Sequence, residues 1–227
     1  MVDVIGMRTL ALLPVAACMS STTQVPDPVE RPWATYAIPA GEHTATVDKP
    51  GLHNPIDGVT DVVGRDYELA LDGSAIYVLT QPTQPEDQYD WNKLPGLSDC
   101  GTVDLAVDGA MFGWRWRIET SSLEVTAYAN NDGVHLTIEA PLFTLDADDL
   151  VAAEALRYTV AREQDMYAFT VRGVVRGREI ATAARLPRRC SELERDPLAW
   201  AGAFYFGGTS VAPQPITAQM RESTYEP

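Results

Sequence analysis

Two arginines stand two residues apart in the run FGWRWRI at residues 112–118. A guanidinium carries a planar fork of hydrogen-bond donors, so Arg115 and Arg117 are candidates for contacting an anionic or hydroxyl-rich ligand. The alternative is a solvated strand face, on which Arg117 only pairs with Glu124 across two strands, for well under about 1 kcal/mol. The sequence leaves both interpretations open.

Aromatic and imidazole side chains accompany these arginines. Tyr128 could stack on a sugar ring, although tyrosine is common in strands, and Trp91 in the Pro-rich stretch 81–94 is a second stacking candidate. His135 lies on the outward side of its strand by alternation. With Tyr128 or Arg115 nearby it could serve as the base of a lyase that removes a proton next to a uronate carboxylate. The plain alternative is a surface histidine.

Two acidic clusters offer carboxylate oxygens of the kind that bind Ca²⁺. Neither has the spacing of an EF-hand loop, and the cluster of Asp146, Asp148 and Asp149 is also explained as the acidic first turn of a helix. We therefore expect no cofactor beyond, at most, a weak calcium site. The clusters are Asp146, Asp148 and Asp149, and Glu86, Asp87 and Asp90.

The chain that must position these side chains alternates apolar and polar residues with a period of two. Half-buried strands are predicted at 122–130, 133–140 and 165–173, joined as a meander by turns at 131–133 and 163–165. The pattern predicts an all-β fold, a two-sheet antiparallel jelly-roll sandwich with at most one short helix. Further strands are predicted at 36–39, 43–47, 67–71, 75–79, 102–107, 112–118, 157–161, 174–181, 201–206 and 216–220, and the helix at 148–156.

One predicted hairpin decides which side chains share a face. Setting Ile118 opposite Leu123 buries both tryptophans of the 112–118 run, whereas a one-residue slip would place Trp116 against Glu124. The core pairs are then Trp116 with Val125 and Trp114 with Ala127. The polar face pairs Arg117 with Glu124, Arg115 with Thr126, and Gly113 with Tyr128, where the missing side chain leaves a notch beside the tyrosine ring.

The N-terminal segment has the order of an export signal. A short basic region begins at Met7, LALLPVAA at 10–17 is an apolar core, and VAAC at 15–18 resembles the lipobox of bacterial lipoproteins. In that family the cysteine, here Cys18, is lipidated and becomes the N-terminus after cleavage. Either Met1 or Met7 is the start, and a plain secretory signal is the alternative. The predicted divisions are a signal peptide at 1–17, a Ser/Thr/Pro tether at 18–32 and one β-sandwich domain at 33–227.

The remaining two cysteines, Cys100 and Cys190, predict one disulfide in an exported chain, with two buried thiols as the alternative. The 227 residues include 17 basic and 32 acidic side chains, for a formal charge of −15. Such a surface repels nucleic acid and anionic lipid, so we expect membrane contact through the lipid anchor alone. No apolar run of about 18 residues or more occurs in the body of the chain.

Three stretches together carry a resemblance: 92–100 (NKLPGLSDC), 112–116 (FGWRW) and 205–216 (YFGGTSVAPQPI). They resemble a group of uncharacterised secreted bacterial proteins, many of them lipoproteins. More loosely, they are similar to the concanavalin-like jelly rolls of lectins, laminarinase-type glucanases and alginate-lyase-type enzymes. The resemblance implies two curved antiparallel sheets with a concave face that often holds glycans in relatives of this architecture. The paired-carboxylate strand of the glucanases and the Gln-Ile-His element of the lyases are absent.

These features predict a cell-envelope lipoprotein, on the outer membrane or cell surface if the cell is Gram-negative, whose sandwich binds a glycan or another surface polymer. An enzyme is not favoured. The alternatives are a polysaccharide-cleaving lyase that uses Arg115, Tyr128 and His135, and a structural component of an envelope protein complex. The residues expected to bind the polymer are Arg115, Arg117, Glu124, Tyr128 and Trp91.

Overall fold

The computed structural model describes residues 32–48, 58–60, 63–102, 104–189, 198–200 and 204–223; the predicted signal peptide, Cys18 and Cys190 lie outside them. The strands of the larger sheet are β1 (Ala34–Ile38), β2 (Thr46–Val47), β4 (Gly64–Leu71), β10 (Leu156–Arg162), β11 (Met166–Val175), β12 (Arg178–Pro187) and β14 (Ile216–Ser223). Those of the smaller sheet are β5 (Asn92–Ser98), β6 (Gly109–Arg117), β7 (Ser122–Asn131), β8 (Val134–Thr137) and β9 (Phe143–Asp146). A separate pair joins β3 (Gly58–Thr60) to β13 (Leu198–Trp200).

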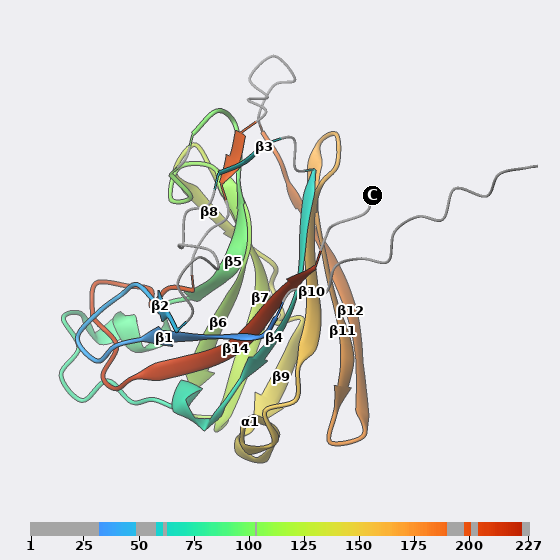
Figure 1. The fold of residues 1–227 in the computed structure, drawn as a ribbon. Helices are drawn as coiled ribbons and strands as arrows, with labels where there is room; N and C mark the ends of the chain where they lie inside the picture. The colour runs from blue at the N-terminus through green and yellow to red at the C-terminus, as the bar shows by residue number, and fades with distance from the viewer. Residues whose placement is uncertain are drawn as a thin grey trace, which may run out of the picture.

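The two sheets pack face to face as an antiparallel jelly-roll sandwich, which confirms the predicted fold class (Figure 1). The larger sheet has the order β12-β11-β10-β4-β14-β1-β2. The smaller sheet has the order β5-β6-β7-β8, with β9 paired to β7. Along the described chain, β1, β2 and β4 belong to the larger sheet, β5 to β9 to the smaller sheet, and β10 to β12 and β14 to the larger sheet again. Strands far apart in sequence, such as β4 and β14, are therefore neighbours.

The core lies between the sheets and is rich in aromatic side chains. On β6 every second residue points into it, and Phe112 and Trp114 are fully buried. Trp114 stacks on Phe204 with ring centroids 5.8 Å apart, and Phe112 meets Tyr158 of the facing sheet edge to face at 5.1 Å. Each such side chain stabilises the folded state by about 2–3 kcal/mol through burial. This packing fixes which side of β6 faces away from the core.

The hairpin of β6 and β7 has the predicted faces and a different register. Trp116 pairs with Leu123, two residues from the predicted pairing, because Ile118 lies in the turn, where it is 41% exposed, and Ser121 closes the turn with a φ of +49°. A shift of two residues keeps every side chain on its face, so burial could not distinguish the registers. The predicted pairs Trp116–Val125, Trp114–Ala127, Arg117–Glu124, Arg115–Thr126 and Gly113–Tyr128 are wrong; the structure pairs Trp114 with Val125, Arg115 with Glu124, Gly113 with Thr126 and Met111 with Tyr128.

Other predicted elements have different bounds. The 165–173 strand is part of β11 in the larger sheet, so it does not continue a meander with β7 and β8. β5 was not predicted, because Pro95 and Gly96 interrupt its pattern where its register against β6 shifts. The ranges 75–79 and 102–107 hold turns and irregular backbone over their described residues, the 174–181 range is broken by a turn at Arg176 and Gly177, and the helix α1 spans only Ala147–Ala152.

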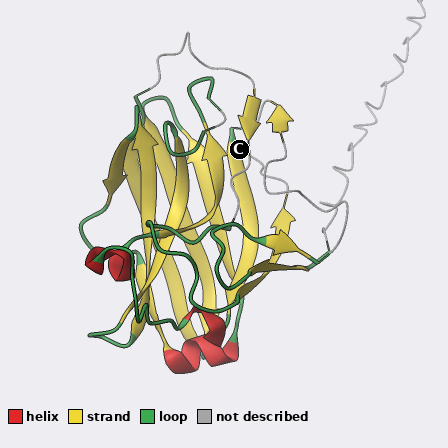
Figure 2. Cartoon of the chain, turned by 90° about the vertical axis from the view of Figure 1, so that its left-hand side faces the viewer, coloured by secondary structure: helices red, strands yellow, loops and turns green. Residues whose placement is uncertain are grey.

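Short helices lie at the ends of strands (Figure 2). Besides α1 they are the 3-10 helices η1 (Gly73–Ala75) and η2 (Pro85–Tyr89). Within the described part of the chain, no helix has the length and apolar character needed to cross a membrane. Because the helices are so short, most candidate functional side chains come from strands and from the segments between them.

Candidate functional site

The smaller sheet presents one face to the core and one away from it, and we call the second the outer face. Side chains alternate along β6 and β7, so Arg115 and Glu124 lie on the outer face while their neighbours Trp114 and Val125 lie in the core. The stretch 85–91, which contains η2, lies against this face. The predicted binding residues, Arg115, Arg117, Glu124, Tyr128 and Trp91, are therefore all on or against one surface.

Arg115 is held by three groups. Its Nε donates to Oε2 of Glu124 at 2.8 Å, and its Nη1 donates to the carbonyl oxygen of Tyr89 at 3.0 Å. The guanidinium also lies over the indole of Trp91, 3.9 Å from the ring centroid. The side chains of Arg115 and Glu124 are only 21% and 17% exposed. These contacts make Arg115 a positioning residue that fixes the 89–91 backbone and the indole.

Trp91 packs on Gly113. A Cβ at Gly113 would stand 3.3 Å from the indole and 3.0 Å from Cγ2 of Thr126, so the missing side chain lets the indole approach the strand closely. The predicted notch at Gly113 therefore exists, but it receives Trp91 and does not lie beside Tyr128. Trp91 as a whole is partly exposed. An aromatic ring held in one orientation with part of its surface in solvent is suited to stacking on the apolar side of another ring.

The three stretches that carry the sequence resemblance meet around Trp91. Gly113 belongs to the second of them, and the other two are joined by backbone hydrogen bonds of 2.8 and 3.0 Å that Lys93 and Tyr205 exchange. Gly207 donates its N–H to Oδ1 of Asn92 at 2.8 Å, and a Cβ on this glycine would come within 2.1 Å of the Trp91 carbonyl oxygen. The resembling stretches thus form the frame that positions one tryptophan.

Arg117 lies at the other end of the outer face, next to the 118–121 turn. Its Nε is 3.4 Å from the carboxylate of Glu119, and its guanidinium lies 4.8 Å from the centroid of the Tyr89 ring. The Tyr89 hydroxyl donates to the same Glu119. The predicted Arg117–Glu124 ion pair is wrong, because the register of the hairpin places Arg115 opposite Glu124 and Arg117 opposite Ser122. Arg117 instead helps to hold the end of η2 against the sheet.

Tyr128 forms a group with Lys93 and His135. The Nζ of Lys93 lies 4.3 Å from the centroid of the Tyr128 ring and donates to the Trp91 carbonyl oxygen. The ring of His135 is 5.7 Å from that of Tyr128, and its Nδ1 is 2.5 Å from Oδ1 of Asn130. Tyr128 is only 5% exposed, so it offers little surface for stacking, whereas His135 is exposed.

Burial changes the proton affinity of this group. It raises the pKa of Tyr128 to about 12 and lowers the pKa of Lys93 to about 8, an effect that Asp90 opposes. Burial and the nearby Asp87 raise the pKa of Asp90, and Lys93 partly offsets the rise. The Asp90 carboxylate accepts no hydrogen bond from the described residues. Lys93 was missed in the sequence because 81–94 was interpreted as a loop, and its one signal was its place in a resembling stretch beside Trp91.

In each acidic cluster at least one carboxylate has partners within the chain. Ser210 donates to Asp87, and Oγ1 of Thr209 donates to the same carboxylate at 2.8 Å. Burial raises the pKa of Asp87, but these hydrogen bonds outweigh it and lower the pKa to about 2. In the other cluster Nη2 of Arg178 donates to Asp149 at 2.6 Å. Arg176 Nη1 lies within 3.8 Å of Asp146, Asp148 and Asp149. No group of three histidine, cysteine or acidic side chains suited to a metal occurs among the described residues, so the calcium expectation gains no support there.

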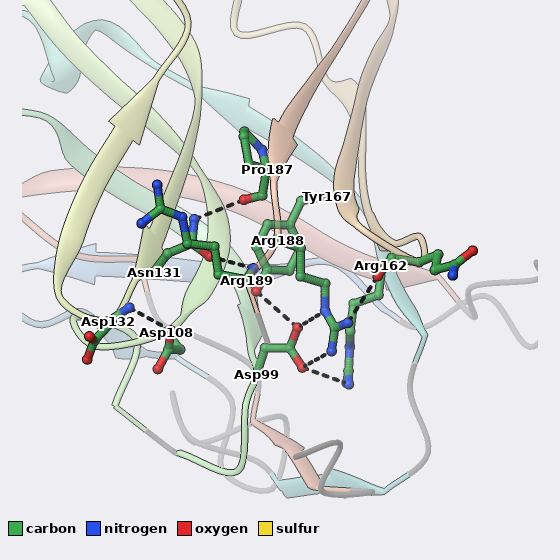
Figure 3. Close-up of polar contacts among 10 residues, drawn as sticks. Asp99, Asp108, Asn131, Asp132, Arg162, Tyr167, Pro187, Arg188 and Arg189 are labelled. Atoms are coloured by element: carbon green, nitrogen blue, oxygen red, sulfur yellow. Dashed lines mark hydrogen bonds and ion pairs between the residues drawn. The ribbon is translucent and has the colours of Figure 1, made fainter. Parts of the chain in front are cut away.

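A second polar cluster joins the two sheets (Figure 3). Asp99, which follows β5, accepts hydrogen bonds from Nε and Nη2 of Arg188, from Nη1 of Arg162 at 3.1 Å and from the Tyr167 hydroxyl at 3.0 Å. The side chains of Asp99 and Arg188 are each 1% exposed. This full set of partners makes the cluster structural.

No family model matches the chain, and no curated protein matches it. Among solved structures, the laminarinase catalytic domain from Thermotoga maritima is similar with 9% identity and a TM-score of 0.42, over 86% of this chain and 78% of that one. A xylan β-1,4-xylosidase from Bacillus halodurans gives 11% identity and a TM-score of 0.42, over 76% of this chain and 30% of that one. An alginate lyase from Klebsiella pneumoniae gives 11% identity and a TM-score of 0.37, over 72% of this chain and 60% of that one.

The chain therefore spans less than a third of the xylosidase, 60% of the alginate lyase and 78% of the laminarinase domain. Likenesses of this strength do not indicate what this chain binds or cleaves. The sheet order and register, in contrast, establish the jelly-roll architecture that the resemblance implied.

Proposed function

We propose that the chain is an envelope lipoprotein whose sandwich binds a glycan on the outer face of the smaller sheet. One observation carries the proposal: Trp91 is held partly exposed on Gly113 by the Arg115 guanidinium, and Glu124 fixes that guanidinium in turn. A sugar ring has an apolar side that stacks on such an indole and hydroxyls that reach the polar side chains around it.

The arrangement is organised before any ligand arrives. The Trp91 backbone is fixed by Gly207 on one side, and its ring is fixed by Gly113 and Arg115 on the other. A rigid site loses less conformational entropy on binding than a mobile one, so a single aromatic contact contributes more to the affinity. The proposed roles are therefore stacking for Trp91 and positioning for Arg115 and Glu124.

The test is glycan binding by the exported domain and by two matched variants. Trp91→Ala removes the stacking surface, whereas Trp33→Ala removes another partly exposed tryptophan that lies beside an arginine, Arg221, at 5.0 Å in the larger sheet. We expect a glycan array and calorimetry to show binding by the parent and by Trp33→Ala and a loss of about tenfold or more in Trp91→Ala. Binding that survives in a folded Trp91→Ala protein, or a stable protein partner with no glycan binding, would overturn the proposal.

A second candidate is a polysaccharide lyase on the same face, which the proximity of Tyr128 and His135 favours. The high pKa of Tyr128 keeps its hydroxyl protonated near neutral pH, so the exposed His135 is the base in this alternative. Arg115, the third residue predicted for a lyase, is bound to Glu124. Ultraviolet absorbance from an unsaturated uronide, lost in His135→Ala, would support the lyase. No absorbance with alginate, glucuronan or heparin-like substrates would count against it.

Envelope anchoring and the disulfide are part of the proposal. Lipid labelling of the full chain that is abolished in Cys18→Ser tests the anchor. For the disulfide, Arg188 and Asp99 are in contact and stand within two residues of Cys190 and Cys100 in the sequence, which supports pairing of the two cysteines. A mass 2 Da below the reduced value and one cross-linked peptide are expected from the unreduced protein, and two free thiols would refute the pairing.

A further inference from the structure

We infer that the ligand of the outer face is an uncharged, hydroxyl-rich glycan and not a uronate or sulfated polymer. The inference rests on the proposed function, because it names the class of glycan that the same face takes. It depends on how the cations and carboxylates of the face are paired.

Both arginines of the outer face are matched by carboxylates of the protein. Arg115 is bound to Glu124, with Nη2 and Oε2 2.8 Å apart, and Arg117 lies 3.4 Å from Glu119. A carboxylate or sulfate on a ligand would have to compete with these internal partners. Because both pairs already lie at contact distance, binding an anion would break an existing pair for each one gained.

Lys93 is the third cation, and it is also engaged. Its Nζ donates to the Trp91 carbonyl oxygen and lies over the ring of Tyr128, while Asp90 favours its charged form. Burial lowers its pKa to about 8, so a part of the population is neutral in weakly alkaline solution. Lys93 therefore supplies less positive charge to a ligand than an exposed lysine would.

The group left open next to Trp91 is an acceptor. The Asp90 carboxylate is partly buried, has no hydrogen-bond donor among the described residues, and lies close to a second carboxylate, Asp87. Polar groups that are removed from water require hydrogen-bond partners, and sugar hydroxyls are donors of the right size. A carboxylate accepts from a hydroxyl and repels a polyanion, and the formal charge of −15 on the whole chain adds to that repulsion.

The experiment measures affinity for neutral and anionic polysaccharides at two salt concentrations. The neutral probes are soluble β-glucan, xylan and galactan, and the anionic probes are alginate, polygalacturonate and heparin. We expect a neutral probe to bind with a Kd that changes less than about twofold between about 20 and 500 mM NaCl, since screening has no ligand charge to act on.

Two isosteric variants localise the effect. Asp90→Asn removes the charged acceptor and is expected to weaken neutral-glycan binding about tenfold. Asp165→Asn makes the same change at an exposed aspartate in the turn between β10 and β11 and is expected to have no effect. An anionic probe that binds more tightly than every neutral probe, with an affinity that falls steeply with salt, would overturn this inference and leave glycan binding intact. Binding of no probe at all would overturn the proposed function and this inference with it.

Discussion

Asp99→Asn is expected to be the most damaging single polar substitution in the cluster that joins the two sheets. The Asp99 carboxylate receives the Arg188 guanidinium, Arg162 and the Tyr167 hydroxyl, and the Asp99 and Arg188 side chains are 1% exposed (Figure 3). The variant leaves a buried guanidinium without its carboxylate. Removing one partner of a buried ion pair costs about 3–5 kcal/mol, which for a domain of this size lowers Tm by roughly 6–20 °C.

The pH dependence follows from the same contacts. Burial raises the pKa of Asp99, but hydrogen bonds and charge from Arg188 and charge from Arg162 outweigh it and hold the pKa below the usual value. A carboxyl whose pKa is lower in the folded than in the unfolded state contributes stability above the unfolded pKa and loses it as the pH falls through the folded pKa. The difference in unfolding free energy between parent and Asp99→Asn is therefore expected to be full near pH 7 and to shrink below about pH 4.

Urea unfolding followed by tryptophan fluorescence measures the free energy, with thermal melts as a second readout. Glu163→Gln is the matched control, because it breaks an ion pair with Arg185 in which both side chains are largely exposed, and we expect no measurable change. The double variant Asp99→Asn with Arg188→Gln should recover part of the loss, since the guanidinium is no longer stranded. A loss under about 1 kcal/mol in Asp99→Asn, or one that does not vary with pH, would refute the reasoning.

Three further predictions concern the outer face. A double-mutant cycle of Arg115→Ala with Glu124→Ala should give a coupling energy of about 1–2 kcal/mol, and the same cycle with Arg117→Ala a coupling near zero; the reverse would restore the register predicted from sequence. Lys93→Met should make the stability of the protein less dependent on pH, because the lowered pKa of this lysine means that the parent gains stability as the pH rises from about 8 to 10. Urea denaturation at about pH 8 and about pH 10 should show this gain in the parent and not in the variant. Gly207→Ala places a Cβ 2.1 Å from a backbone carbonyl oxygen, so a loss of about 1–3 kcal/mol and weaker glycan binding are expected, and unchanged stability would contradict the close contact.

Alternation was enough to predict the fold class and the faces of the smaller sheet. Trp114 and Trp116 are buried and Arg115 is on the outer face, as the period of two required. The pattern could not predict the register of the hairpin, because a shift of two residues leaves each side chain on the same face of the sheet. The register is instead decided by the turn, which takes Ile118 out of the strand. The partner of Glu124 was therefore assigned to the wrong arginine.

The candidate site was predicted only in part, for a related reason. Trp91 was predicted as a stacking candidate, but its support comes from Gly113 and Gly207, which belong to two other segments of the chain, and no local pattern encodes such contacts. Lys93 was overlooked because Pro95 and Gly96, which are uncommon inside strands, made β5 resemble a loop in the sequence. Tertiary packing, which brings these segments together, is what the single sequence does not display.

The central claim is tested most directly by adding a glycan that binds the protein to the ¹⁵N-labelled protein and following the indole N–H signals of its five tryptophans. Trp91 is the partly exposed tryptophan on the outer face, Trp33 lies on the larger sheet, and Trp114 and Trp116 are in the core. If a glycan stacks on the outer face, the Trp91 signal shifts in a saturable way and Trp33 does not respond. A saturable shift of Trp33 with an unchanged Trp91 signal would place the ligand elsewhere and contradict the proposed site.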